Sequence, residues 1–372
     1  MVLKFGKGVI KGGIITLIYY GTPVAAQESS KTTDSLLESQ LSQQDHADLT
    51  FQEQLTKKVV GNEQDQIITL VVENDSLGAA GTDKNYTSGV RLGYLDVNAD
   101  LPEIAYTLDR VVPTFGINET SSVFYSLGQN IYTPQSISQT EQDPDDRPWA
   151  AHLYGSIGLV TVTDNHLDEI EASLGIVGPA ALGEQAQKFV HTHITTDSPT
   201  PRGWSNQLNH EPTFSLGWQR RFPSYWELNG GGVSIAASPY YGATLGNAHT
   251  FADAGVTFRL SPERDTWQDA PVRVRPALPG TGYFEAPEDG WSWYLFAGLE
   301  GRAVARNIFL DGNTFSNSHS VDKKYFVADA NAGLALTYEQ YRLSYTMVYR
   351  TKEFEGQDDP GVFGALSFGV RF

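Results

Sequence analysis

The feature that most constrains the fold is an alternation of apolar and polar residues, in segments of about ten residues, from Gln66 to the C-terminus. In the last segment one face carries Leu366, Phe368, Val370 and Phe372, and the other carries Ala365, Ser367, Gly369 and Arg371. Alternation of this kind predicts strands with one apolar face. Earlier segments place charged residues such as Glu300, Arg302 and Arg342 on the second face. A polar lumen accepts charges there, whereas the core of a packed sandwich would penalise them.

Twelve such segments predict an all-β fold, a twelve-stranded antiparallel transmembrane β-barrel. They lie at 66–74, 86–97, 122–132, 149–163, 166–176, 211–221, 225–238, 249–260, 291–304, 325–337, 340–350 and 362–372. No apolar run after residue 26 is long enough to cross a bilayer as a helix, so any membrane span must use strands. A terminal Phe closing the last strand resembles the C-terminal signal of bacterial outer-membrane proteins.

The N-terminus has the order of a secretory signal peptide. Lys4, Lys7 and Lys11 precede a short apolar stretch, and Val24-Ala25-Ala26 supplies a small-residue cleavage site. We therefore expect residues 1–26 to be removed on export. Residues 27–65 are polar and lack apolar periodicity, which predicts a flexible periplasmic segment, with a short helix near 36–41 as the alternative.

Composition removes several classes of function. The net charge of −18 argues against nucleic acid as a partner, because phosphate binding needs basic patches. The chain has no cysteine, which excludes disulfides, zinc–thiolate sites and a thiol nucleophile. Abundant Tyr and Phe, 18 of each, suit a barrel in the outer membrane, which we expect to be monomeric.

The loops follow from the strand order. If the N-terminus is periplasmic, the odd-numbered connections face the cell exterior, and these include the long stretches 133–148 and 177–210. The turns at 163–165 and 338–339 are then short and periplasmic. The connection 261–290, with five prolines, is long and falls on the periplasmic side, which the pattern does not explain.

This order brings a set of polar residues to the outer rim. Asn74 and Asp75 end the first strand and offer adjacent oxygen ligands for a hard cation such as Ca²⁺. His191, in the loop after the fifth strand, is a candidate general base, and Thr87 could orient the base or a water molecule. A histidine-activated water beside a cation is sufficient for ester hydrolysis.

Simpler interpretations remain open for the same residues. An Asn-Asp pair at a strand end is most often a turn former, and a single His in a surface loop is usually only solvated. His152 falls on the inward face of a strand, where a hydrogen bond in the lumen is the expected role. No Gly-x-Ser-x-Gly motif is present, which disfavours an ordinary serine hydrolase.

Several motifs in fixed order resemble the LpxR family of outer-membrane lipid A deacylases, from about residue 66 to the C-terminus. They are Glu73-Asn74-Asp75, Asp83-x-x-Tyr86-Thr87-x-Gly89, Gly128-Gln129-Asn130-Ile131-Tyr132-Thr133-Pro134, Asp146-Arg147-Pro148 and Gly178-Pro179 followed by Gln187-x-x-x-His191. The resemblance implies a twelve-stranded barrel with a Ca²⁺-dependent site near the outer leaflet. That site would remove the 3′-linked acyloxyacyl chain from lipid A of lipopolysaccharide.

Matched motif by motif, the resemblance implies that His191 is the general base. Asn74, Asp75, Thr87 and Gln187 would complete the metal and oxyanion site, and Asp197 occupies the family's acidic position after the histidine. Lys84, Lys188 and Arg202 are the nearby cations for lipid phosphates. The 135–147 loop departs from relatives that carry lysines there, since it holds Glu141, Asp143, Asp145 and Asp146.

Two other functions fit the same strand pattern. One is a structural barrel or small pore with a degenerate site. The other is a phospholipase acting on glycerolipids of the membrane, which would use the same chemistry.

Overall fold

The computed structural model describes residues 66–78, 84–111, 115–163, 165–193, 199–263, 270, 273–274, 281–287 and 290–372. The expected signal peptide, the polar segment 27–65 and Asp197 lie outside these residues. Within the described part of the chain, no helix has the length and apolar character needed to cross a membrane.

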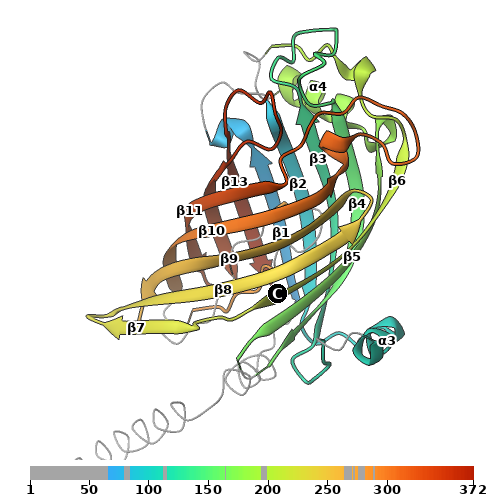
Figure 1. The fold of residues 1–372 in the computed structure, drawn as a ribbon. Coiled ribbons are helices and arrows are strands. Elements are labelled where there is room, and N and C mark those ends of the chain that lie inside the picture. The colour runs from blue at the N-terminus through green and yellow to red at the C-terminus, as the bar shows by residue number, and fades with distance from the viewer. Residues whose placement is uncertain are drawn as a thin grey trace, which may run out of the picture. The chain divides into compact units, whose positions relative to one another are not determined.

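Antiparallel strands form one closed barrel wall, and nearly all of them pair with their neighbours in sequence (Figure 1). The wall strands are β1 (Gln66–Asn74), β2 (Asn85–Asp96), β3 (Ser122–Thr133), β4 (Ala150–Val162), β5 (Leu167–Val177), β6 (Glu211–Arg221), β8 (Val233–Gly246), β9 (His249–Pro262), β10 (Trp291–Asn307), β11 (Phe326–Tyr338), β12 (Tyr341–Arg350) and β13 (Gly361–Arg371). β1 pairs with β13, and β6 pairs with β8, which closes the ring. The predicted twelve-stranded antiparallel barrel is confirmed.

One predicted strand is wrong in its bounds. The segment 225–238 was expected to be a single wall strand, but it contains the short strand β7 (Trp226–Gly230), which pairs only with β8. Gly231 and Gly232 have φ values of 67° and 82°, and they reverse the chain between β7 and β8. The seventh wall strand therefore runs from Val233 to Gly246.

The wall has the expected alternation between its two faces. On β1, Ile68, Leu70 and Val72 are exposed, whereas the intervening Ile67, Thr69 and Val71 are buried. Because successive side chains of a strand point to opposite faces, the exposed series is the outward, lipid-facing one.

Buried charges balance one another inside the barrel. Asp329 accepts hydrogen bonds from Arg302 at 2.8 Å and from two nitrogens of Arg350 at 2.9 Å, and Arg273 lies 3.6 Å away. His152 is buried as well, and its Nε2 lies 2.8 Å from the Thr213 hydroxyl, as expected for a hydrogen bond within the lumen.

The long connection between β9 and β10 is explained by its path, because it folds back into the barrel. Arg371 and Arg342 donate hydrogen bonds to the carbonyl oxygens of Phe284 and Tyr283, at 3.1 and 3.2 Å. These two aromatic residues pack with Val97, just after β2, and with inward residues of five wall strands, Ile67, Leu95, Phe124, Val160, Val162 and Leu167. We call residues 273–274 and 281–287 the luminal segment.

A second connection at the same end, residues 97–121, is also long and contains α3 (Glu103–Val111). Its Ala105 packs against Val123, Leu159 and Ile170. Since Val123 and Ile170 share the faces of the exposed Tyr125 and Leu174, α3 lies against the outside of the wall.

Candidate active site

The end of β1 and the start of β2 form one side of the candidate site. Asn74 caps the short 3₁₀ helix η1 (Asp75–Leu77), accepting the Ser76 N–H at 2.9 Å, and its Nδ2 donates to the Thr87 carbonyl at 3.1 Å. Asp75 is buried, and its Oδ2 accepts the Lys84 N–H at 2.9 Å. The predicted turn-forming role of Asn74 and its proximity to Thr87 are therefore both present.

Thr87 occupies an irregular position in β2. Tyr86 pairs with Tyr132 and Ser88 pairs with Ile131, so Thr87 is the extra residue of a β-bulge. Its hydroxyl lies 2.6 Å from the hydroxyl of Thr133. Sequence reasoning missed Thr133 as a partner, although it lies in the quoted Gly128–Pro134 motif.

The other two predicted catalytic residues, Gln187 and His191, lie on the helix α4 (Gly183–His193). The first turn of α4 packs closely, because a Cβ on Gly183 would lie 2.7 Å from the Trp204 ring and would collide with the Cβ of Ala151. Ala186 packs on a buried cluster that includes Ile131, Ala151 and Trp204. Ile131 shares its face of β3 with the exposed Leu127, so α4 covers the outer surface of the wall at the rim (Figure 1).

Gln187 faces this packed surface and is buried. The indole N–H of Trp204 donates to its Oε1 at 2.9 Å, and its Nε2 has no hydrogen-bond partner in the described structure. The amide is thus oriented with its NH₂ group available as a donor. Trp204 is a second residue that sequence reasoning missed, since a Trp in a long loop gives no signal of its partner.

His191 lies one turn further along the same side of α4. Its Nδ1 lies 2.9 Å from the carbonyl oxygen of Pro199, which can only accept, so Nδ1 carries a proton and donates it. A neutral imidazole bound in this way has its lone pair on Nε2.

The predicted phosphate-binding lysines both have acidic partners. Lys84 Nζ lies 2.9 Å from Asp359 Oδ2, and this hydrogen bond lowers the pKa of Asp359. Lys188 Nζ lies 2.6 Å from Glu184 on the same helix. Exposed pairs of this kind contribute little to stability, so a phosphate could displace either carboxylate.

The acidic 135–147 loop uses its most buried carboxylate for its own structure. Asp146 accepts the N–H groups of Gln135 at 2.6 Å and Arg147 at 2.7 Å, and burial raises its pKa. Arg147 is buried over the Tyr132 ring and lies 3.5 Å from Glu353. The Asp146-Arg147-Pro148 motif therefore anchors a loop.

The donor set on the wall fits a hard cation. Within the described ranges, no group of three or more His, Asp or Glu side chains is arranged to hold a metal. Asp75 and Asn74 nevertheless supply only oxygen ligands, the type that Ca²⁺ prefers. Ca²⁺ takes six to eight oxygens, so backbone carbonyls, water and substrate oxygens would have to complete the shell.

Comparison with known proteins identifies the family. The family model described as "Outer membrane protein LpxR" matches residues 19–372. The chain belongs to the LpxR family. The LpxR family is an outer-membrane one, so the predicted location in the outer membrane is confirmed together with the predicted family.

The solved structure of an LpxR protein supports the fold. LpxR from Salmonella typhimurium superposes with a TM-score of 0.65 at 20% identity, over 82% of this chain and 100% of that chain. The β domain of the Bordetella autotransporter BrkA gives a TM-score of 0.38 at 9% identity, over 84% and 99% of the two chains. The translocator domain of NalP from Neisseria meningitidis gives 0.33 at 11% identity, over 89% and 98%. Among curated protein sequences, none matches this chain significantly.

Proposed function

We propose that this LpxR-family barrel is a calcium-dependent esterase that removes the 3′-linked acyloxyacyl chain from lipid A. The observation that supports it best is the position of α4, which holds Gln187 and His191 over the outer surface of the wall. Below the site the same surface is apolar and exposed, with Val72, Val90, Leu92 and Leu127. An acylated substrate could therefore reach the site sideways from the membrane.

His191 would act as the general base. Its Nδ1–H is held by Pro199, so Nε2 would take a proton from water as the water oxygen attacks the ester carbonyl carbon. The ester C–O bond then breaks, and the proton on His191 passes to the departing sugar oxygen.

Gln187 would stabilise the negative charge that develops on the carbonyl oxygen. Its Oε1 is held by Trp204, so its NH₂ group can donate without reorientation. Thr87, fixed by Thr133, would orient the attacking water. We propose that Asp197, which lies outside the described residues, binds the substrate.

Asp75 and Asn74 would hold Ca²⁺ through their side-chain oxygens. When bound there, Ca²⁺ would polarise the ester carbonyl and attract lipid phosphate. Lys84, whose N–H is bonded to Asp75, and Lys188, on α4, would bind lipid phosphates by exchanging their carboxylate partners.

The two alternative functions are a pore and a phospholipase, and the structure fits them unequally. An open pore fits poorly, because Tyr283 and Phe284 are buried in the lumen against inward residues of five strands. Phospholipase activity shares all of the chemistry and is distinguished by substrate.

The direct test is an assay of the purified, folded barrel on lipid A and on a glycerophospholipid, with calcium or with chelator. We expect release of the acyloxyacyl unit from lipid A in calcium, and none after chelation or in His191→Ala. Release of fatty acid from the glycerophospholipid alone would replace the proposal with a phospholipase. No release from either substrate would contradict an esterase.

A further inference from the structure

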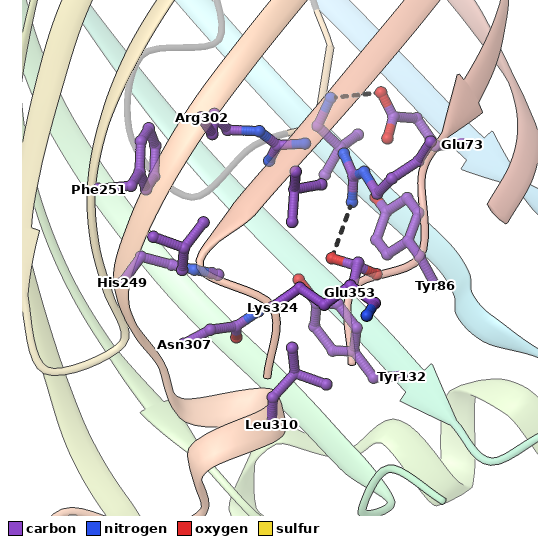
Figure 2. A pocket seen from close by; sticks show the side chains of 14 residues that line it. Glu73, Tyr86, Tyr132, His249, Phe251, Arg302, Asn307, Leu310, Lys324 and Glu353 are labelled. Carbon is purple, nitrogen blue, oxygen red and sulfur yellow. Dashed lines mark hydrogen bonds and ion pairs between the residues drawn. The ribbon is translucent and has the colours of Figure 1, made fainter. Parts of the chain in front are cut away.

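A pocket with a mixed polar and apolar lining lies inside the barrel, immediately behind the β1 side of the site (Figure 2). Glu73 lines it and is 1% exposed. The Glu73 carboxylate accepts the backbone N–H of Val274 at 2.8 Å, the contact marked beside Glu73 in Figure 2. Arg273 Nε lies 3.8 Å from the same oxygen, and its Nη2 lies 3.6 Å from Asp329. The charge of Glu73 is thus compensated by the luminal segment.

Gly89 leaves the space that the Val274 side chain occupies. It is the residue opposite Glu73 in the pairing of β1 with β2. A Cβ at Gly89 would lie 2.8 Å from Val274 Cγ1 and would collide with the Tyr86 hydroxyl. Val274 also packs on Val71, two residues before Glu73 on the inner face of β1. We call Val71, Glu73 and Gly89 the Val274 seat.

The Val274 seat and the candidate site lie on opposite faces of the same strand ends. Asn74 and Ser88 form the next pair in the register after Glu73 and Gly89. Because side chains alternate, Glu73 points into the lumen and Asn74 points outward. Asn74 is in turn bonded to the Thr87 carbonyl at 3.1 Å. A shift of Glu73 would therefore move Asn74, the next residue in the chain and part of the candidate site.

We propose that Arg273 and Val274 of the luminal segment position the active site, and that Glu73 is the positioning residue through which they act. The catalytic part of this inference rests on the proposed function. Glu73 touches no reacting atom. It fixes the β1–β2 strand ends, so that Asn74, Asp75 and Thr87 keep one geometry on the outer face.

Three variants test this inference. Glu73→Ala removes the acceptor and the charge, whereas Glu73→Gln keeps an acceptor for the Val274 N–H and loses only the charge. The matched control is Glu169→Gln, since Glu169 is a fully buried carboxylate that pairs with Arg221 at 2.7 Å at the other end of the barrel. Each full-length variant is purified folded and measured by amide hydrogen exchange and by steady-state kinetics.

In Glu73→Ala we expect amide exchange at residues 74–76 and 87–89 to be at least about tenfold faster than in the wild type. We expect kcat to fall about tenfold or more with KM within twofold, a smaller change of the same kind in Glu73→Gln, and wild-type values in Glu169→Gln. If Glu73→Ala does not fold, Glu73→Gln supplies the test.

Wild-type exchange in the Glu73 variants would overturn the inference, whether or not the barrel cleaves lipid A. Faster exchange with an unchanged kcat would overturn its catalytic part. A wild-type barrel inactive on lipid A would refute the proposed function separately, and the exchange result would still decide the positioning.

Discussion

The indole nitrogen of Trp204 donates a hydrogen bond to Oε1 of Gln187 over 2.9 Å, and this bond joins the loop after α4 to the helix itself. This bond fixes the orientation of the Gln187 side-chain amide, because it holds the amide oxygen toward Trp204. An amide whose oxygen is engaged presents its NH₂ group, so a Trp that touches no substrate sets the donor of the proposed oxyanion site.

Trp204→Phe should therefore lower kcat while the barrel stays folded. Loss of the indole N–H leaves Gln187 Oε1 without its donor and lets the amide rotate, and we expect a fall of about tenfold, or about 1.4 kcal/mol. Gln187→Ala should cost more, about 10²–10³-fold, as for other oxyanion donors. Trp218→Phe is the control, because the Trp218 indole nitrogen has no hydrogen-bond partner in the described structure. Equal kcat for Trp204→Phe and wild type would exclude this role.

Asp75→Asn should weaken the response to calcium. The change removes the one carboxylate among the proposed ligands and keeps an oxygen that can accept the Lys84 N–H, 2.9 Å away in the wild type. We expect the calcium concentration for half-maximal activity to rise at least about tenfold, since Ca²⁺ affinity depends on ligand charge. Measuring activity over a range of calcium concentrations gives this midpoint. Asp359→Asn, which affects only the exposed Lys84 pair, should leave the midpoint within twofold. An unshifted midpoint in Asp75→Asn would argue against Asp75 as a ligand.

The pair of hydroxyls at the bulge makes a separate prediction. Thr133→Val keeps the shape of the side chain but removes the partner of the Thr87 hydroxyl, 2.6 Å away in the wild type. We expect Thr87→Val to lower kcat about tenfold or more, Thr133→Val to lower it less, and the double variant to match Thr87→Val alone, since the second residue acts through the first. Steady-state kinetics of the two single variants and the double variant measure these kcat values. Additive losses would mean that the two threonines act independently.

Stability of the barrel should depend on Asp329. Three arginines converge on this buried carboxylate, so Asp329→Ala would remove a negative charge that all three share. Breaking a buried pair in this way costs about 3–5 kcal/mol. The gel-shift assay of heat modifiability should show unfolding at a clearly lower temperature than the wild type. Asp359→Asn, at an exposed pair, should unfold at the wild-type temperature.

Much of the fold follows from the sequence, because a strand that faces lipid on one side and a polar lumen on the other must alternate. The bounds of β1 are those predicted, and each end of β13 lies within one residue of its predicted position. The error at 225–238 arose because apolar and polar residues alternate on both sides of Gly230-Gly231-Gly232, where the backbone reverses. The three glycines were the available signal.

The site was predictable only in part. Asn74 and Thr87 become neighbours through the register of two adjacent strands, which a sequence pattern can indicate. The contacts of Gln187 with Trp204 and of Glu73 with Val274 join residues 17 and 201 positions apart through irregular loops. Such contacts depend on how loops pack, and no periodicity records them.

The most direct test of the central claim is mass spectrometry of lipid A from cells that express this chain or its His191→Ala variant, both shown to be folded in the outer membrane. The account predicts that the wild type removes the mass of one acyloxyacyl unit, and that the variant leaves lipid A unchanged. Equal loss of that unit in both strains would contradict His191 as the base, and intact lipid A in both would contradict the deacylase function.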